Sequence, residues 1–506
     1  MSRHAACALL LLQAIPATAT TFSVTSTDDS GPGTLRQAIL DANANGGADT
    51  IAFAIPGTGV HTIAPTGSLP SITGPLLIDG YSQPGAQPNG HTPAQGGLDG
   101  TLAIEVSGQN LPPTQSEAFH PIEADLTLRG LVVNRFQWVA YVPGGASQDS
   151  TLAIEGCYLG TDATGTQAAG ASQGAAVRSE DEAHALLRIG GAAPAARNLI
   201  SGFTDTSVGE GVAINVHPAR GGPIVEGNLI GTDASGTLAI PNLGGIGIAR
   251  SGSASVGSGA RIKDNVVSGN LQYGLLVTCG FGADTTCIDG LAITGNVIGA
   301  RRDGSAPLPN GTYGIRFVTN DAGAAHIVVG GDAAADENVI AYNAGIGLTI
   351  ANASKGTIEI ARNRIFSNGG LDVDLPNPES GRNANDAHDA DGVYANRLQN
   401  FPLIESMSQA GNQLTVRYRV PTATSYATYP LAVRFYRPGA SGGDRWVASD
   451  TYDAVDAEIA RTVTLALASP AGLPGLVATA SDAAGNTSEF SEIFVSDLIF
   501  ADGFDP

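Results

Sequence analysis

The chain has 506 residues, a formal net charge of −22 at pH 7 and 67 glycines, with only 25 lysines and arginines together. This surplus of acidic side chains argues against nucleic acid and anionic membrane surfaces as partners, because both carry negative charge. The length suffices for two or three folding units with a large apolar core.

Residues 1–19 have the organisation of a secretory signal. Arg3 precedes an apolar stretch over 5–15, and the small residues 17–19 form a cleavage site. The sequence therefore predicts export by the general secretory route to a secreted or cell-surface location. No other stretch approaches the roughly 18 apolar residues of a membrane span, so we expect no integral membrane segment in the mature chain.

Residues 20–125 are predicted to form an N-terminal cap and the first coils of a repeat. A strand-like stretch at 22–25 leads into a turn over 28–33, after which Thr34 and Gln37 have the spacing of a capping box. The apolar residues that follow lie at i, i+3, i+4 and i+7 and predict a short capping helix with one buried face: Leu35, Ala38, Ile39 and Ala42.

A repeated phrase runs through residues 126–400. The sequence EGCYLGTD at 155–162 returns as EGNLIGTD at 226–233, and related phrases follow. Each suits a short strand that ends in a tight turn. The phrases place an asparagine at intervals of 30, 37, 31, 42 and 25 residues, which is typical of a solenoid with loops of variable length: Asn198, Asn228, Asn265, Asn296, Asn338 and Asn363.

The repeat predicts an all-β fold, a parallel β-helix solenoid. Helical repeats require longer stretches of 3.6-residue periodicity and contain little glycine, so they are excluded. We expect the repeated asparagines to form a structural ladder, because buried amides stacked along an axis must satisfy one another. Cys157 occupies the ladder position of its own phrase and is expected to be a buried small residue rather than a catalytic thiol.

Two segments resemble secreted bacterial right-handed parallel β-helix repeat proteins, a group with a pectate-lyase-like fold that includes polymorphic outer-membrane and adhesin-like proteins. The first is TLRQAILDAN at 34–43, followed by GADTIAF at 47–53. The second is NRLQNFP at 396–402, which resembles the segment that closes such solenoids before a β-sandwich. The resemblance implies a right-handed solenoid and an exported protein, and says little about a reaction.

Residues 401–496 change to strands of strict alternation, at 413–420, 431–436, 462–467 and 476–480. This pattern predicts a small β-sandwich of about seven strands. The sequence SDAAGNTSEFS at 481–491 is similar to the last hairpin of Ig-like or fibronectin-like modules on bacterial surface proteins. Residues 497–506 are expected to be a C-terminal tail.

The remaining candidate sites are few. Cys279 and Cys287 bracket a short insertion, and in an oxidising compartment we expect a disulfide between them. Residues 261–263, RIK, match one of the four motifs of polygalacturonases, and 170–174, GASQG, match a nucleophile elbow without the strand and helix that it requires. We interpret both matches as chance.

An acidic segment at the end of the solenoid is the one candidate metal site. Carboxylates and a turn glycine suit Ca²⁺, whose ligands are oxygens. The alternative is a solvated turn in which the side chains accept hydrogen bonds from the backbone. The candidate ligands are Asp372, Asp374, Asp386, Asp389 and Asp391. Calcium is the only cofactor that the sequence suggests, and no catalytic residue is assigned.

The leading interpretation is an exported, non-enzymatic β-helix protein that acts as an adhesin-like or glycan-binding module, with a polysaccharide or a host or neighbouring cell-surface molecule as its partner. One alternative is a polysaccharide lyase or glycoside hydrolase, which requires acidic side chains from successive coils to converge. A second alternative is a structural spacer.

Overall fold

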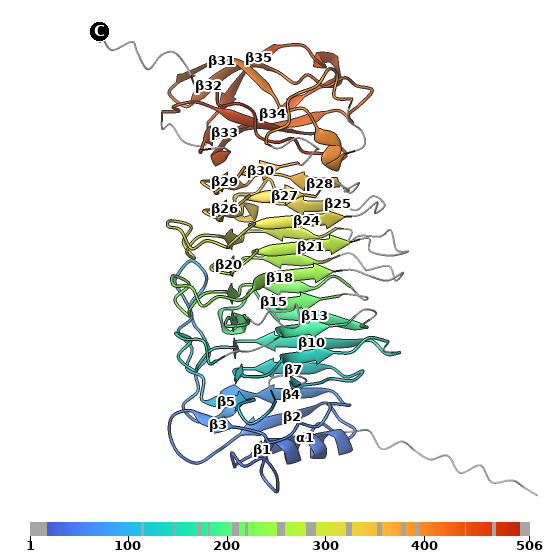
Figure 1. Ribbon diagram of the computed structural model, residues 1–506, viewed down its shortest axis with the longest axis vertical. Coiled ribbons are helices and arrows are strands. Elements are labelled where there is room, and N and C mark those ends of the chain that lie inside the picture. Colours follow the sequence, from blue (N-terminus) through green and yellow to red (C-terminus); the bar gives the residue numbers. More distant parts are fainter. Residues whose placement is uncertain are drawn as a thin grey trace, which may run out of the picture.

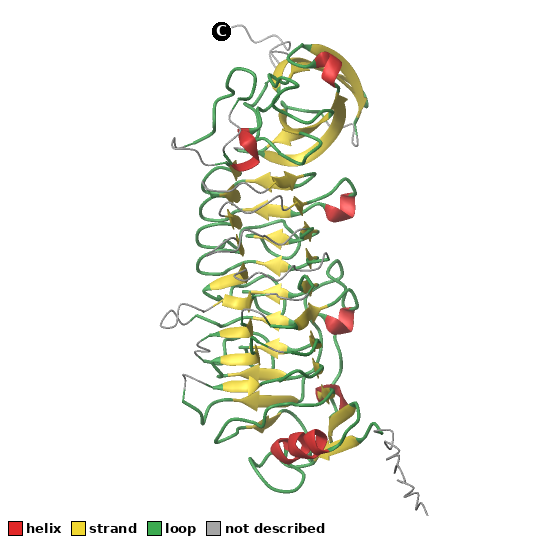
Figure 2. Ribbon diagram, turned by 90° about the vertical axis from the view of Figure 1, so that its right-hand side faces the viewer, coloured by secondary structure: helices red, strands yellow, loops and turns green. Residues whose placement is uncertain are grey.

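The computed structural model describes residues 18–112, 116–145, 147–170, 174–180, 183–204, 212–217, 221–249, 259–279, 290–319, 326–351, 357–375, 381–390, 394–440, 442–467 and 472–495. The described chain is mostly β and forms a long stack of parallel strands, with an antiparallel unit at the C-terminal end (Figure 1). Its single α-helix, α1 (Leu35–Ala44), lies at the opposite end (Figure 2).

The coils of the stack form three parallel sheets, and each coil from β4 onward contributes one strand to each sheet. The first sheet contains β1 (Thr21–Val24), β2 (Asp49–Phe53), β4 (Leu76–Asp79), β7 (Leu126–Arg129), β10 (Ser150–Glu155), β13 (Ala185–Gly190), β16 (Ile224–Glu226), β19 (Arg261–Lys263), β22 (Ala292–Thr294), β25 (His326–Val329) and β28 (Thr357–Ile360). The second contains β3 (His61–Ile63), β5 (Ile104–Ser107), β8 (Val132–Asn134), β11 (Tyr158–Leu159), β14 (Leu199–Ile200), β17 (Leu229–Ile230), β20 (Val266–Val267), β23 (Val297–Ile298), β26 (Val339–Ala341) and β29 (Arg364–Phe366). The third contains β6 (Glu117–Phe119), β9 (Trp138–Val142), β12 (Ala175–Ser179), β15 (Val212–Val216), β18 (Gly244–Ala249), β21 (Leu275–Cys279), β24 (Ile315–Thr319), β27 (Leu348–Ile350) and β30 (Val373–Asp374).

The register of the first sheet explains why so short a strand suffices in each coil. One inward position is aligned in ten successive strands, and every coil fills it with a buried Ile, Leu or Val. Each such side chain therefore packs on the one above and the one below, and burial of this unbroken column stabilises the stack. The column is Ile51, Ile78, Leu128, Ile154, Ile189, Val225, Ile262, Ile293, Val329 and Ile360.

The repeated asparagines lie in one buried ladder, which we call the first ladder. Each side-chain amide donates to the Oδ1 of the asparagine in the next coil, at 2.8 to 3.0 Å, from Asn198 through Asn228, Asn265, Asn296 and Asn338 to Asn363. The backbone N–H of Cys157 donates to Asn198 at 2.8 Å, so the cysteine occupies the ladder position of its own coil. Cys157 is fully buried, and burial raises the pKa of its thiol to about 12.

A second ladder, which the repeated phrases do not predict, runs beside the first. Its amide groups bond at 2.7 to 3.0 Å from Asn242 through Asn270, Asn310 and Asn343 to Asn368, and Asn368 donates to Asp372. Asp372 is completely buried and ends this ladder. The two ladders satisfy the polar groups of the coil corners, which burial would otherwise make costly.

The predicted helix is present as α1. Thr34 is its N-cap, with a side-chain oxygen that accepts from the N–H of Gln37 at 3.3 Å. All four predicted apolar residues are buried in the core that the first strands share. Among the described residues, no helix has the length and apolarity needed to cross a membrane. Short 3₁₀ turns account for the other helical residues: η1 (Gly80–Ser82), η2 (Pro194–Ala196), η3 (Ala334–Asp336), η4 (Ala395–Leu398) and η5 (Ala454–Asp456).

The antiparallel unit has its own apolar core. Three of its strands form a separate sheet: β31 (Leu403–Ala410), β32 (Gln413–Arg419) and β35 (Arg461–Ala466). The others extend the second sheet of the solenoid through β29: β34 (Gly443–Tyr452), β33 (Leu431–Pro438) and β36 (Val477–Ser481). The segment 488–494 also bonds antiparallel to β36. Solenoid and antiparallel unit are therefore joined by hydrogen bonds as well as by the chain.

Candidate functional site

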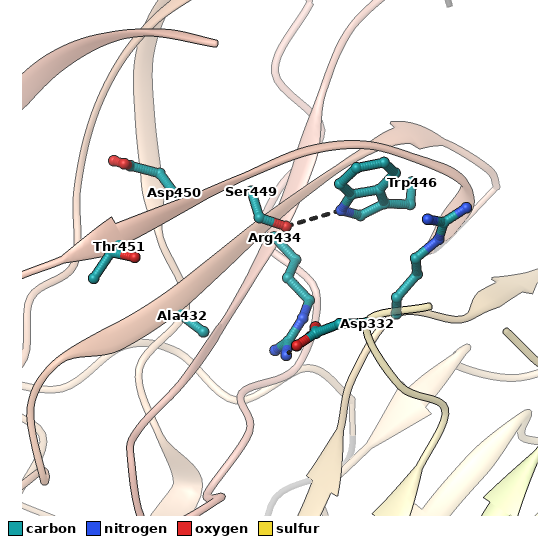
Figure 3. A pocket seen from close by; sticks show the side chains of 8 residues that line it. Asp332, Ala432, Arg434, Trp446, Ser449, Asp450 and Thr451 are labelled. Atoms are coloured by element: carbon teal, nitrogen blue, oxygen red, sulfur yellow. Dashed lines mark hydrogen bonds and ion pairs between the residues drawn. The ribbon is translucent and has the colours of Figure 1, made fainter. Parts of the chain in front are cut away.

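A cleft of about 530 Å³ lies at the junction of the solenoid and the antiparallel unit (Figure 3). We call it the junction cleft. Asp332 and Arg362 contribute from the last coils of the solenoid, and strands β33 and β34 contribute the remainder. Its lining consists of Asp332, Arg362, Ala432, Arg434, Trp446, Ser449, Asp450 and Thr451. Clefts between structural units that combine an aromatic wall with a few polar groups are common ligand sites.

Strand alternation explains how the cleft acquires Arg434. Along β33, Val433 and Phe435 face the core of the antiparallel unit, so Arg434 and Tyr436 face the end of the solenoid. The phenol of Tyr436 donates to the carbonyl of Ala361 at 3.3 Å. The wall that β33 forms is thus fixed to the last coils.

Arg434 is a buried cation with several partners. Its guanidinium donates to Ser481 Oγ at 3.1 Å and pairs with Asp332 at 3.3 Å and Glu359 at 3.4 Å. Only 4% of Arg434 is exposed, whereas 91% of the Asp332 side chain is exposed. The exposed carboxylate therefore has acceptor capacity left for a ligand hydroxyl.

Trp446 forms the aromatic wall. The guanidinium of Arg362 lies 4.4 Å from the centroid of its ring, and the same arginine pairs with Glu337 at 2.9 Å. The indole N–H donates to Ser449 Oγ at 2.9 Å (Figure 3). These contacts hold the ring of a half-buried tryptophan in one orientation, as a rigid stacking surface requires.

Each acidic group in or beside the cleft has a partner that fixes its position. Asp450 accepts a hydrogen bond from the phenol of Tyr418 and lies 3.7 Å from Arg461. Burial, and then the hydrogen bond to Asp450, raise the pKa of the Tyr418 phenol. Asp332 and Glu359 share Arg434. The cleft thus offers a polar ligand the Asp332 carboxylate as an acceptor, Arg434 as a donor and the ring of Trp446 as an aromatic face.

A second aromatic surface lies on the third sheet. The rings of Trp138 and Tyr141 on β9 are stacked, with centroids 4.9 Å apart and planes 21° apart. His120 meets Tyr141 edge-on at 5.3 Å and pairs with Glu117 at 2.9 Å. This surface contains the other of the chain's two tryptophans, which makes it a useful reference for experiments on the cleft.

The predicted calcium ligands are distributed among different roles. Asp372 ends the second ladder, and Asp389 accepts from Gln399 at 2.7 Å, from the N–H of Asn400 at 3.0 Å and from Thr422 at 3.1 Å. Asp386 accepts from the N–H of Ala390 at 3.0 Å. Only the contact of Asp386 is the backbone hydrogen bond of a solvated turn, because Asp372 and Asp389 are buried and also accept from side chains.

Two further predicted ligands complete this set. Asp374 is partly buried at the end of β30, and burial raises its pKa. Asp391 lies outside the described residues. Within the described chain, no three His, Cys, Asp or Glu side chains gather in a group that could hold a metal ion. Calcium binding stays a prediction for this segment.

The other predicted features are distributed as follows. Cys279 ends β21, and Cys287 lies outside the described residues, so their disulfide stays a prediction. The tripeptide RIK forms β19, where Arg261 pairs with Glu226 at 3.1 Å. Residues 171–173 of the GASQG match also lie outside the described chain.

Sequence reasoning missed the junction cleft. Its polar residues come from segments 75 to 102 positions apart in the chain, such as Arg434 with Glu359 and Asp332. The single usable signal was the charged Arg434 between two apolar residues of a predicted strand. Comparison with known proteins does not identify the site either, since no protein-family model matches the chain and no curated protein matches its sequence.

Proposed function

We propose that the chain is an exported, non-enzymatic glycan-binding module that holds its ligand in the junction cleft. In this proposal a right-handed parallel β-helix, capped by α1, presents an Ig-like sandwich at the far end of a rigid stack. The signal-like residues 1–19 and the resemblance of residues 34–53 and 396–402 to exported β-helix proteins support the compartment and these finer features.

The lining of the junction cleft carries the proposal. Sugars present apolar C–H faces and many hydroxyl groups, so a site for them combines an aromatic plane with closely placed donors and acceptors. Trp446 supplies the plane, and Ser449 and Thr451 supply hydroxyl groups. The ion-paired Asp332 and Arg434 supply an acceptor beside a donor.

Binding fits the described cleft better than hydrolysis or elimination. A glycoside hydrolase needs one carboxyl group as a proton donor and a second as base or nucleophile. In the cleft, Asp332 is paired with a guanidinium and Asp450 with a phenol and a guanidinium. These partners already bind carboxylate oxygens, so both groups are placed as hydrogen-bond acceptors rather than as the proton donor and nucleophile of one reaction.

The two tryptophans allow a direct test of where a glycan binds. In a Trp138→Phe variant, Trp446 is the only tryptophan, so its fluorescence reports on the cleft alone. Titration with polysaccharides that the wild-type chain retains should change the emission of this variant. Trp446→Ala should weaken retention roughly tenfold, since stacking of this kind contributes up to about 1.5 kcal/mol.

Two controls separate loss of the site from loss of the fold. Tyr426→Ala removes an exposed aromatic residue of the antiparallel unit that does not line the cleft, and should leave affinity unchanged. Trp446→Phe keeps an aromatic face and should retain most of the affinity. Equal affinity of wild type and Trp446→Ala, with both proteins folded, would place the glycan elsewhere and contradict the proposal.

A further inference from the structure

A second cavity, of about 240 Å³, lies on the side of the solenoid beneath a long loop. This loop, residues 83–101, leaves the solenoid after η1 and runs alongside later coils (Figure 1). It is attached there by hydrogen bonds from Asn89 to the carbonyl of Pro194 at 2.7 Å and from the N–H of Leu98 to the carbonyl of Ala234 at 2.7 Å. We call this loop the lateral loop and the cavity the lateral pocket.

Two arginines line the lateral pocket without a carboxylate partner in the described chain. Arg197 is 2% exposed, and its guanidinium donates to the carbonyls of Gly227, His91 and Gly96 at 2.8 to 3.3 Å. These bonds use Nε and Nη1, and no described acceptor engages Nη2. The guanidinium of Arg302 forms no hydrogen bond or ion pair with the described residues.

A buried guanidinium that forms no direct ion pair is costly, and a second one nearby adds to the cost. Burial, and then the neighbouring charge of Arg302, lower the pKa of Arg197 to about 10, although the charge of Asp99 acts in the opposite direction. Two neighbouring arginines that form no ion pair are unusual in a chain of net charge −22. At physiological ionic strength the Debye length is roughly 8 Å, so the charges that line the pocket, two guanidinium groups and two carboxylates, act on a small anion there more strongly than the distant acidic surface does.

Two carboxylates also line the pocket, Asp264 and Asp303. Asp303 accepts from the hydroxyl of Ser305 at 2.7 Å, within its own loop. Asp264 directly precedes an asparagine of the first ladder and has φ +55°, where Gly156, Gly227 and Gly295 occupy the same position of other coils with φ between +61° and +75°. Burial raises the pKa of Asp264, whereas the hydrogen bonds from Ser305 lower the pKa of Asp303.

We infer that the lateral pocket binds an oxyanion, and that its occupant in a glycan is the anionic group of one acidic sugar unit. The two guanidinium groups would donate hydrogen bonds to the carboxylate or sulfate oxygens of the sugar, while Asp264 and Asp303 would accept hydrogen bonds from its hydroxyl groups. The volume of about 240 Å³ corresponds to roughly eight water molecules, which suits one small ligand rather than a polymer segment.

The lateral pocket and the junction cleft lie along one corner of the solenoid. Arg197, Asp264 and Arg362 each directly precede an asparagine of the first ladder, so they occupy equivalent positions in their coils. Three ladder steps separate the coil of Asp264 from that of Arg362, a distance of roughly 14 Å at about 4.8 Å per strand. The inference rests on the proposed glycan binding for the identity of the ligand, although oxyanion binding itself is independent of the cleft.

Calorimetric titration of the full mature chain with sodium sulfate, D-glucuronate and D-glucose tests the inference. We expect binding of at least one anion and none of glucose, and the preferred anion distinguishes a sulfate from a carboxylate ligand. Arg302→Gln keeps the length of the side chain and should weaken anion binding by roughly ten- to a hundredfold, as expected for loss of a charge-assisted hydrogen bond. Arg301→Gln removes the same charge from the exposed neighbouring residue and should change affinity less than twofold.

The outcomes separate this inference from the proposed function. Anion binding that Arg302→Gln weakens and Trp446→Ala leaves intact supports the lateral pocket. Equal anion affinity in Arg302→Gln and wild type, or no anion binding by wild type, overturns it, even where Trp446→Ala still weakens glycan retention. Anion binding without any glycan retention would support the pocket and contradict the glycan-binding function.

Discussion

Removal of one asparagine side chain from the first ladder should destabilise the solenoid more than the small size of that side chain suggests. The side chain of Asn265 makes four hydrogen bonds. Its Oδ1 accepts from the backbone N–H and the side-chain amide of Asn228, at 3.0 and 2.9 Å. Its amide donates to the carbonyl of Val225 at 2.9 Å and to Asn296 at 3.0 Å. All four lie in the buried corner of the coil, where water cannot replace the lost partners without rearrangement.

Asn265→Ala removes these four bonds at once. The backbone N–H of Asn228 loses its described partner, which costs about 1 to 3 kcal/mol for a buried donor. The three other partners each lose a bond with a net contribution of about 1 kcal/mol. The Asn228 amide keeps its bond to Ile189, and Asn296 still accepts from the backbone of residue 265, which limits the damage. The sum is a loss of about 5 kcal/mol in the free energy of unfolding.

Denaturant unfolding followed by circular dichroism measures this loss. The control is Asn110→Ala, because Asn110 is exposed and its side chain donates one hydrogen bond, to Ala64 at 3.0 Å. Its replacement should cost less than about 1 kcal/mol. If Asn265→Ala were no more destabilising than Asn110→Ala, the ladder would not contribute to stability in the way argued above.

Two further predictions concern titration and calcium. Burial raises the pKa of Glu489 to about 7, and its carboxyl accepts from the N–H of Leu375 at 2.8 Å and of Asn383 at 2.7 Å at the junction. The native state keeps this proton up to about pH 7, whereas the unfolded state releases it near pH 4.5. The protonated carboxyl therefore contributes fully to the free energy of unfolding below pH 4.5. This contribution of about 3 kcal/mol is lost as the pH rises through 7. Unfolding midpoints at pH 5 and 8 should show this loss in wild type, and a Glu489→Gln variant with the same pH dependence would contradict the assignment. If the segment around Asp386 and Asp389 binds calcium as the sequence predicts, saturating calcium should raise the melting temperature, with magnesium as the control, and an unchanged temperature would leave the hydrogen-bonded turn as the whole explanation.

The sequence anticipated those features that repeat. The first ladder could be predicted because its asparagines recur within nearly identical phrases, so their equivalence is visible without coordinates. The helix at 35–44 could be predicted from Thr34 and a single apolar face, both of which are local signals.

The second ladder could not be predicted from the sequence, because the residues around its asparagines vary from coil to coil. Asn242, Asn270, Asn310 and Asn343 share little beyond a glycine three or four residues later. Asp372 then looked like one of a cluster of metal-binding carboxylates, whereas it ends this ladder in the buried corner. A carboxylate near other carboxylates in sequence carries no information on which neighbours it meets in space.

The junction cleft could not be predicted from the sequence for a different reason. Its chemistry arises where the last coils meet β33 and β34, and pairs such as Arg434 with Asp332 join residues 102 positions apart. Strand alternation indicates that Arg434 points away from the core of its own unit, but only the packing of two units shows what it faces. The same limit applies to the lateral pocket, which depends on the path of the loop 83–101.

The most direct test of the glycan-binding account is incubation of the protein with a panel of neutral and acidic polysaccharides, with retention, reducing ends and the absorbance of unsaturated products measured in parallel. The account predicts retention of at least one polysaccharide with no release of product. Release of reducing ends or unsaturated products would show a hydrolase or a lyase, and failure to retain any polysaccharide would contradict glycan binding itself.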